Sequence, residues 1–238
     1  MKAPSRVAHS FPHVWNLVCA ATALTTLLAA APTRAAGEPS GGAGESGSWL
    51  SAAALMGSTQ PDAKLADYQW RTSPSAGWGA QVMAGRGRAS AGVRVWSSET
   101  RQSIDVPGAS VNSASVNEMT YEAVIAARVY SVAGVVVEPS LSAGRLHLGY
   151  HPDQVAIPTG GGSGATMVQL GPIDEWQWGG GIVMARPFAG AWSAGLGVDR
   201  RFYSLDTAHR NGTVIQTGRE AFGDWSVRFH ISRRIRIG

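Results

Sequence analysis

The last part of the chain alternates between apolar and polar residues with a period of two. From Trp225 to Ile237 the odd positions are apolar except for Arg233, and the even positions hold only Ser, Arg and His. Successive side chains of a β-strand point to opposite faces, so this pattern predicts a strand with one apolar and one polar face. A helix would scatter the same residues around its circumference.

The same alternation recurs along most of the chain and predicts eight strands. The segment 48–58 is ambiguous because both of its faces are apolar or small. In the segment 135–151 the parity slips by one near Gly144, which predicts a β-bulge and keeps Leu146, Leu148 and Tyr150 on the apolar face. The predicted strands cover residues 48–58, 68–84, 88–103, 118–132, 135–151, 174–186, 190–206 and 225–237.

The connections between these strands alternate in length. The short ones fall near 85–87, 132–134 and 187–189. The longer ones are rich in Gly, Pro, Asn, Asp and Thr and fall near 59–66, 104–116, 152–170 and 207–219. Short turns at one end and long loops at the other are typical of transmembrane β-barrels. The sequence therefore predicts an all-β, up-and-down antiparallel eight-stranded transmembrane barrel with short periplasmic turns and longer extracellular loops.

Alternation alone leaves open which face lies outside, because a soluble lipocalin-like barrel points its apolar face inward. Aromatic residues on the apolar face gather near the long loops, and such rings favour the membrane–water boundary. Glycines on the polar face weaken an exposed strand, but inside a narrow barrel they make room for large neighbours. Both features favour the membrane barrel. The predicted aromatic girdle consists of Tyr68, Trp70, Tyr121, Tyr150, Trp176, Trp178, Phe202 and Trp225.

The N-terminus has the layout of an export signal. Positive residues, an apolar stretch and small residues suited to cleavage follow one another, so residues 1–36 are predicted to be a signal peptide. Residues 37–47 are predicted to be a flexible linker, and 48–238 the barrel. The formal charge of +4 falls to +1 without the signal, so basicity gives no argument for nucleic acid. The single Cys, Cys19, lies inside the signal, so the exported chain needs no disulfide.

The signal, the eight alternating strands, the aromatic girdle and the last strand resemble the small outer-membrane β-barrel proteins of Gram-negative bacteria. The resemblance covers residues 48–238. It implies an outer-membrane location, contact with outer-membrane lipid and lipopolysaccharide, and a monomer that the barrel-assembly machinery inserts. Members of this family usually end in an aromatic residue, and this chain departs from that pattern with Ile237-Gly238.

The polar face predicts a lumen filled by charged side chains. An eight-stranded barrel encloses just enough space for side chains. An unpaired buried charge is costly, so each carboxylate there should face an Arg, whose planar guanidinium matches it. The residues of this predicted network are Arg71, Arg94, Glu122, Arg128, Glu138, Arg145, His147, Glu175, Asp199, Arg201, Arg228 and His230.

No motif in the sequence points to catalysis, a cofactor or a metal. Ser204, Asp206 and His209 are the residue types of a lipid-modifying hydrolase, but the chain has no nucleophile elbow around them. The sequence favours a non-enzymatic structural or surface-interaction protein. Two alternatives stay open: a lipid A-modifying enzyme, deacylase or acyltransferase, of the same architecture, and a soluble periplasmic carrier.

Overall fold

The structure is a computed structural model that describes residues 47–159, 164–211 and 214–237. The predicted signal peptide and residues 37–46 of the predicted linker lie outside the described residues. Within the described ranges, no helix has both the length and the apolar character needed to cross a membrane. The elements are β1 Ser48–Gln60, η1 Ala63–Tyr68, β2 Ser75–Arg86, β3 Ala89–Ser103, β4 Ser113–Ala127, β5 Tyr130–Val132, β6 Val135–His151, β7 Gln154–Pro158, β8 Ala165–Gln169, β9 Ile173–Ala189, β10 Trp192–Asn211 and β11 Val214–Ile237.

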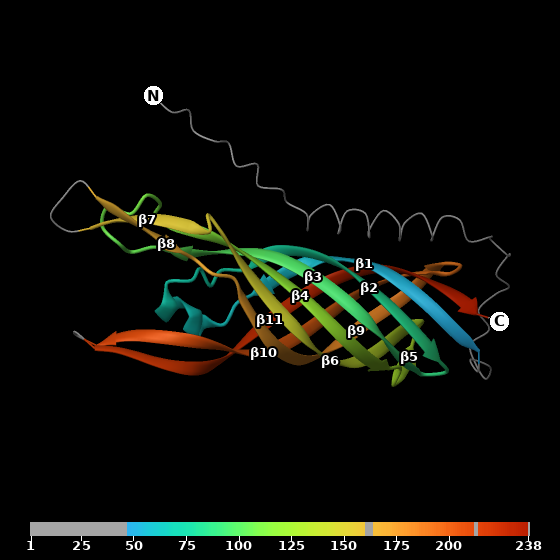
Figure 1. Cartoon of the computed structure of the whole chain (residues 1–238). Helices are drawn as coiled ribbons and strands as arrows, with labels where there is room; N and C mark the ends of the chain where they lie inside the picture. The colour runs from blue at the N-terminus through green and yellow to red at the C-terminus, as the bar shows by residue number, and fades with distance from the viewer. Residues whose placement is uncertain (1–46, 160–163, 212–213, 238) are drawn as a thin grey trace, which may run out of the picture. The chain divides into compact units, whose positions relative to one another are not determined.

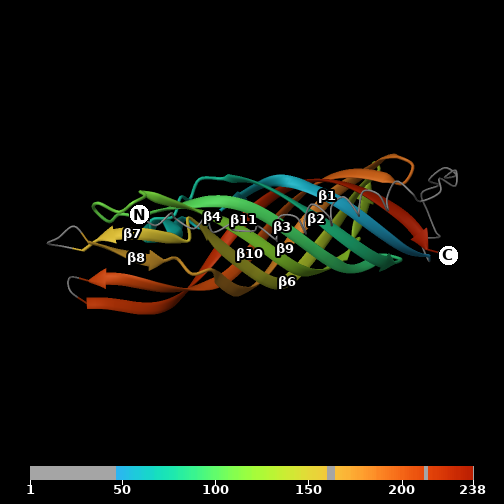
Figure 2. The ribbon, with the colours of Figure 1, turned by 45° about the horizontal axis from the view of Figure 1, so that its top comes forward.

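Eight of these strands close into a barrel, as the sequence predicts. The order β4-β3-β2-β1-β11-β10-β9-β6 is completed by pairing between β4 and β6, so each strand neighbours its successor in the chain. All of these pairs are antiparallel. Figures 1 and 2 show the strands wound around a common interior. Closure leaves the ring without a free edge strand, which is how barrels avoid edge-to-edge aggregation.

Tight turns join the strands at one end, which we call the short-turn end. Gly87, Gly134 and Gly190 lie there with φ of 59°, 77° and 54°. Two-residue hairpin turns need positive φ to match the twist of the strands, and glycine adopts it without steric cost. The turn after β4 also carries the three-residue strand β5, which pairs with β6.

The opposite end, which we call the long-loop end, has more structure than the sequence predicts. Strands β10 and β11 stay paired as far as Asn211 and Val214, so the predicted loop over 207–219 is largely a hairpin. The connection 152–172 contains the separate hairpin of β7 and β8. The predicted strand 68–84 begins only at Ser75, because the preceding residues form η1 and a loop.

The apolar faces of the strands lie outside and the charges inside. Leu196, Val227 and Ile231 are 46%, 43% and 40% exposed, whereas Arg228 and Glu122 are 4% and 3% exposed. This polarity is the reverse of the one that a soluble carrier with an apolar interior requires.

Strand β6 corrects one prediction from the sequence. Its register with β4 runs through Gly144 without a break, so the predicted bulge is absent between Ser140 and His151. The even positions therefore face inward along this whole stretch, and Leu146 and Leu148 are buried. The odd residues Arg145 and His147 consequently point outward.

Candidate functional site

The lumen contains two chemically different parts. We call the first the charged plug, and it consists of Arg94, Glu118, Glu122, Asp199, Arg201, Asp224 and Arg228, all buried. We call the second the apolar cluster, and it lies nearer the long-loop end. It consists of Leu65, Trp70, Val116, Leu146, Leu148, Tyr203, Leu205 and Phe222.

Arg94 on β3 spans the barrel at the centre of the charged plug. Its Nε lies 2.5 Å from Oε2 of Glu122 on the neighbouring β4, and its Nη1 lies 3.3 Å from Oδ1 of Asp199 on β10. Strand β10 stands opposite β3 in the ring of eight. Asp199 also pairs with Arg228 of β11. Gln177 donates to the other oxygen of Glu122 at 3.1 Å. Such direct pairing compensates the desolvation of the buried charges.

A second set of ion pairs lies next to the first, toward the long-loop end. Arg201, 1% exposed, lies 2.8 Å from Glu118 and 3.9 Å from Asp224. The Tyr203 hydroxyl donates to Asp224 at 3.0 Å. The backbone N–H of Asp62 donates to the same carboxylate at 3.0 Å, which fastens the loop before η1 to the plug.

Glycines on β2 make room for a large side chain in the plug. Trp96 is completely buried, and its ring lies 2.4 Å from where a Cβ at Gly77 would stand and 3.1 Å from where one at Gly79 would stand. Its Nε1 donates to Oγ1 of Thr59 at 3.1 Å, and the Arg228 guanidinium lies 5.7 Å from its ring. Lumen glycines therefore admit large neighbours, as the sequence analysis expects.

At the short-turn end the lumen is occupied by Trp49 and two arginines. The guanidinium of Arg234 lies 4.0 Å and that of Arg128 lies 5.8 Å from the Trp49 ring. Arg128 also pairs with Glu138 at 2.8 Å. This arrangement places cations over an aromatic face, which is an attractive geometry.

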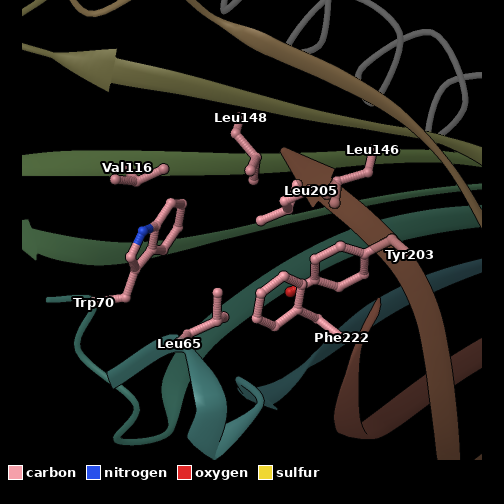
Figure 3. Close-up of a cluster of buried hydrophobic side chains, with 8 residues drawn as sticks. All are labelled: Leu65, Trp70, Val116, Leu146, Leu148, Tyr203, Leu205 and Phe222. Atoms are coloured by element: carbon pink, nitrogen blue, oxygen red, sulfur yellow. The ribbon is translucent and has the colours of Figure 1, made fainter. Parts of the chain in front are cut away.

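The apolar cluster brings together residues from strands on different sides of the barrel (Figure 3). Phe222 stacks on Tyr203 at a centroid distance of 6.0 Å, and Trp70 meets Tyr150 edge-on at 6.3 Å. Leu65 enters the cluster from η1 and is 2% exposed. The 3-10 segment thus inserts an apolar side chain into the barrel mouth.

Beside the apolar cluster lies a partly enclosed cavity of about 580 Å³. Its walls are Leu65, Asp67, Tyr68, Gln69, Trp70, Gln102, Tyr150, Ile173, Leu205, Asp206, Thr207, Ala208 and Phe222. A second space, of about 10 Å³, lies in the charged plug and is bordered by Arg94, Arg228 and His230. A space of that size holds at most one water molecule.

One ion-paired arginine lies beside this cavity. Arg219 on β11 lies 2.5 Å from Glu175 on β9 and 3.1 Å from Asp206 on β10. The hydrogen bonds that Arg219 donates to Glu175 and Asp206 raise the pKa of its guanidinium above its usual value. Tyr68 donates to Glu220 at 2.7 Å. Burial raises the pKa of the Tyr68 phenol, and Glu220 adds to the rise.

The structure distributes the predicted network over several places. Arg94, Glu122, Asp199, Arg201 and Arg228 belong to the charged plug, and His230 borders it half-buried. The predicted residues Arg128 and Glu138 pair at the short-turn end, and Glu175 lies at the cavity mouth.

Three predicted lumen residues lie elsewhere. Arg71 is exposed in the loop after η1. Arg145 points outward, with its guanidinium 4.6 Å from the Trp176 ring, because β6 has no bulge. His147 points the same way and contacts Asp174 at 2.8 Å.

Two plug residues were missed, Glu118 and Asp224. Both occupy the even, inward parity of their strands, at or just before the predicted strand starts. Parity extended outward along β11 reaches Asp224, and the parity of the predicted strand 118–132 already includes Glu118.

The predicted girdle divides in the same way. Tyr121, Trp176, Trp178 and Trp225 are exposed on the outer face, together with Trp78. Phe202 stacks on Trp178 at 4.6 Å. In contrast, Trp70 is buried, and Tyr68 and Tyr150 pack against the apolar cluster. These three residues therefore line the interior and do not belong to the girdle.

The candidate hydrolase residues do not form a described site. Asp206 is bound by Arg219. Ser204 lies two residues earlier on the same strand. The side chain of His209 lies outside what the structure describes.

No protein-family model and no curated protein matches the chain. Several solved structures are similar to it. A major outer membrane protein of Thermus thermophilus is 13% identical, with 79% of this chain and 99% of that chain covered and a TM-score of 0.43. The attachment invasion locus protein Ail of Yersinia pestis is 10% identical, with 81% and 100% covered and a TM-score of 0.40. The outer membrane protease OmpT of Escherichia coli is 8% identical, with 80% and 97% covered and a TM-score of 0.31.

Proposed function

We propose that this protein is a barrel of the Gram-negative outer membrane with a structural or surface-interaction role, and that it neither conducts solutes nor catalyses a reaction. The observation that carries the proposal is the polarity of the wall. Aliphatic side chains cover its outer face, and ion pairs between opposite strands occupy its centre. Such a wall suits hydrocarbon outside and leaves no continuous aqueous path inside.

The outer face also supports the proposed contact with lipopolysaccharide. The Arg200 guanidinium lies 4.9 Å from the Phe202 ring and 5.1 Å from the Trp225 ring. Arg145 lies over Trp176 in a similar way. Arginines beside interfacial aromatic rings can extend their charge to anionic head groups. They also suit bidentate binding of phosphate.

Three measurements test this function together. On a detergent gel of the membrane fraction, the protein is expected to migrate faster before boiling than after, because the unboiled barrel stays closed and compact. The purified protein in a planar lipid bilayer is expected to add no stepwise conductance. Recovery in the soluble periplasm would contradict the membrane location, and steady conductance would contradict the closed lumen. A changed lipid A mass spectrum in cells expressing the chain, abolished by His209→Ala, would contradict the non-enzymatic role.

A further inference from the structure

We propose that the cavity beside the apolar cluster binds a small apolar molecule whose polar group is neutral or positively charged. This binding goes beyond the structural and surface role proposed above. The volume of the cavity, about 580 Å³, lies within the range of small-molecule sites. The walls come from η1, the following loop, β3, β6, β9, β10 and β11, so several elements of the barrel mouth build one concave site.

The lining chemistry fits an apolar body. Tyr68, Trp70, Tyr150 and Phe222 give the cavity four aromatic rings. The rings are held by their own contacts, since Tyr68 meets Phe222 edge-on at 6.0 Å and Trp70 meets Tyr150. Rigid rings of this kind bury a ligand without losing much conformational freedom.

The charges of the lining select against anions. Asp67 and Asp206 both border the cavity, and among its described lining residues there is no Lys, Arg or His. The nearby Arg219 is engaged by Glu175 as well as by Asp206. Carboxylates and aromatic faces both attract cations, whereas the described lining itself holds no cation that could bind an anion, since Arg219, which compensates Asp206, lies outside it.

Polar groups in the same wall could orient the ligand. Gln69, Gln102 and Thr207 border the cavity beside the rings. Gln102 donates to the backbone carbonyl of Tyr68 at 3.1 Å, which keeps its amide at the wall. A few placed polar groups in an otherwise apolar pocket are the usual arrangement for orientation and specificity. Below the cavity, Arg201 and its partners close the lumen, so the ligand enters from the long-loop side.

The experiment uses two probes with the same rings and different charge. N-phenyl-1-naphthylamine is neutral, and 8-anilino-1-naphthalenesulfonate carries an anionic sulfonate. Each is titrated by fluorescence into phosphatidylcholine nanodiscs that hold the protein, and the signal of empty nanodiscs is subtracted. The neutral probe is expected to bind saturably, and the sulfonate about tenfold more weakly or worse.

Matched variants place the binding in the cavity. Ile173→Trp replaces an aliphatic side chain in the cavity wall by a bulky indole, and Ile182→Trp makes the same change on the outer face of the same strand. The first is expected to weaken the neutral probe about tenfold or more, and the second to leave it unchanged. Asp67→Lys, at an exposed lining position, is expected to strengthen the sulfonate. The gel shift before boiling checks that each variant is folded.

Four results would overturn the proposal, the last two of which concern the variants. The first is the absence of saturable binding above empty nanodiscs. The second is equal affinity for the two probes. The third is binding that responds equally to Ile173→Trp and Ile182→Trp in folded protein, and the fourth is a sulfonate affinity that Asp67→Lys leaves unchanged.

Discussion

The charged plug and the apolar cluster occupy the same barrel, yet they leave very different amounts of space. The cavity beside the apolar cluster measures about 580 Å³, and the space in the plug about 10 Å³. In the plug, long arginine side chains extend across the lumen, form ion pairs with carboxylates on distant strands, and fill the interior. Aromatic rings and η1 line the mouth without filling it. The charged plug thus closes the lumen, whereas the proposed ligand site lies nearer its long-loop end.

The largest loss of stability should follow the removal of an arginine from the plug. Arg201→Gln leaves Glu118 and Asp224 buried without their cation, so we expect the free energy of unfolding to fall by about 3–5 kcal/mol. The control Arg200→Gln changes the preceding residue, whose side chain points outward, and should lower the free energy of unfolding by less than about 1 kcal/mol. Urea unfolding in lipid vesicles, followed by tryptophan fluorescence, measures both. Equal losses for the two variants would refute the distinction.

A smaller loss is expected in the apolar cluster. Leu148→Ala truncates a buried side chain, and we expect the free energy of unfolding to fall by about 2–3 kcal/mol, because other members of its cluster border the cavity and can relax toward the space that is left. Leu141→Ala on the outer face of the same strand should cost less, since fluid lipid fills the space that the side chain leaves. The same unfolding assay compares them. A greater loss of unfolding free energy for Leu141→Ala than for Leu148→Ala would contradict the account that Leu141 contacts lipid and Leu148 is packed in the lumen.

The period of two was sufficient to predict the eight strands and most of the plug. Arg94, Glu122, Asp199, Arg201 and Arg228 share the polar parity of long alternating segments, and burial follows from that parity. Asp224 directly precedes the predicted strand 225–237 and is therefore missed, whereas Glu118 opens the predicted strand 118–132 with the inward parity but is absent from the predicted network.

The apolar cluster was harder to predict, for a physical reason. Alternation separates the faces only where one is polar, and near the long-loop end the inward face is apolar as well. The parity slip therefore predicts Leu146, Leu148 and Tyr150 on the lipid face, through a bulge that the pairing of β6 excludes. Leu65 and Trp70 come from η1 and the loop behind it, where period-two patterning carries no information.

A glycine substitution probes the packing of the plug without changing its charge. Gly77→Ala would place a Cβ against the Trp96 ring, and we expect a destabilisation of about 1–3 kcal/mol from overpacking. At Gly149 the nearest atom to such a Cβ is 3.7 Å away, so Gly149→Ala should change stability by less than about 0.5 kcal/mol. Thermal unfolding of the two proteins in the same detergent makes the comparison. Similar shifts of Tm would contradict close packing around Trp96.

The smallest effect is expected at the cavity mouth. The Arg219 side chain is 53% exposed, so Arg219→Gln should cost less than about 1 kcal/mol in spite of its two carboxylate partners. Its effect should be local, with faster amide exchange in residues 214–220 and no change at Arg228. Amide hydrogen exchange by mass spectrometry distinguishes the two regions. Faster exchange throughout the plug would show that the mouth and the plug are one cooperative unit.

The most direct test of the wall's polarity is a nitroxide scan along β11. Single cysteines from 225 to 231 are labelled in lipid vesicles, and collision rates are measured with oxygen and with a water-soluble nickel complex. The account predicts high oxygen accessibility at the odd positions, including Val227 and Ile231, and low accessibility at the even ones, including Arg228. High oxygen accessibility at the even positions, or the absence of a period of two, would contradict a barrel with lipid outside and ion pairs within.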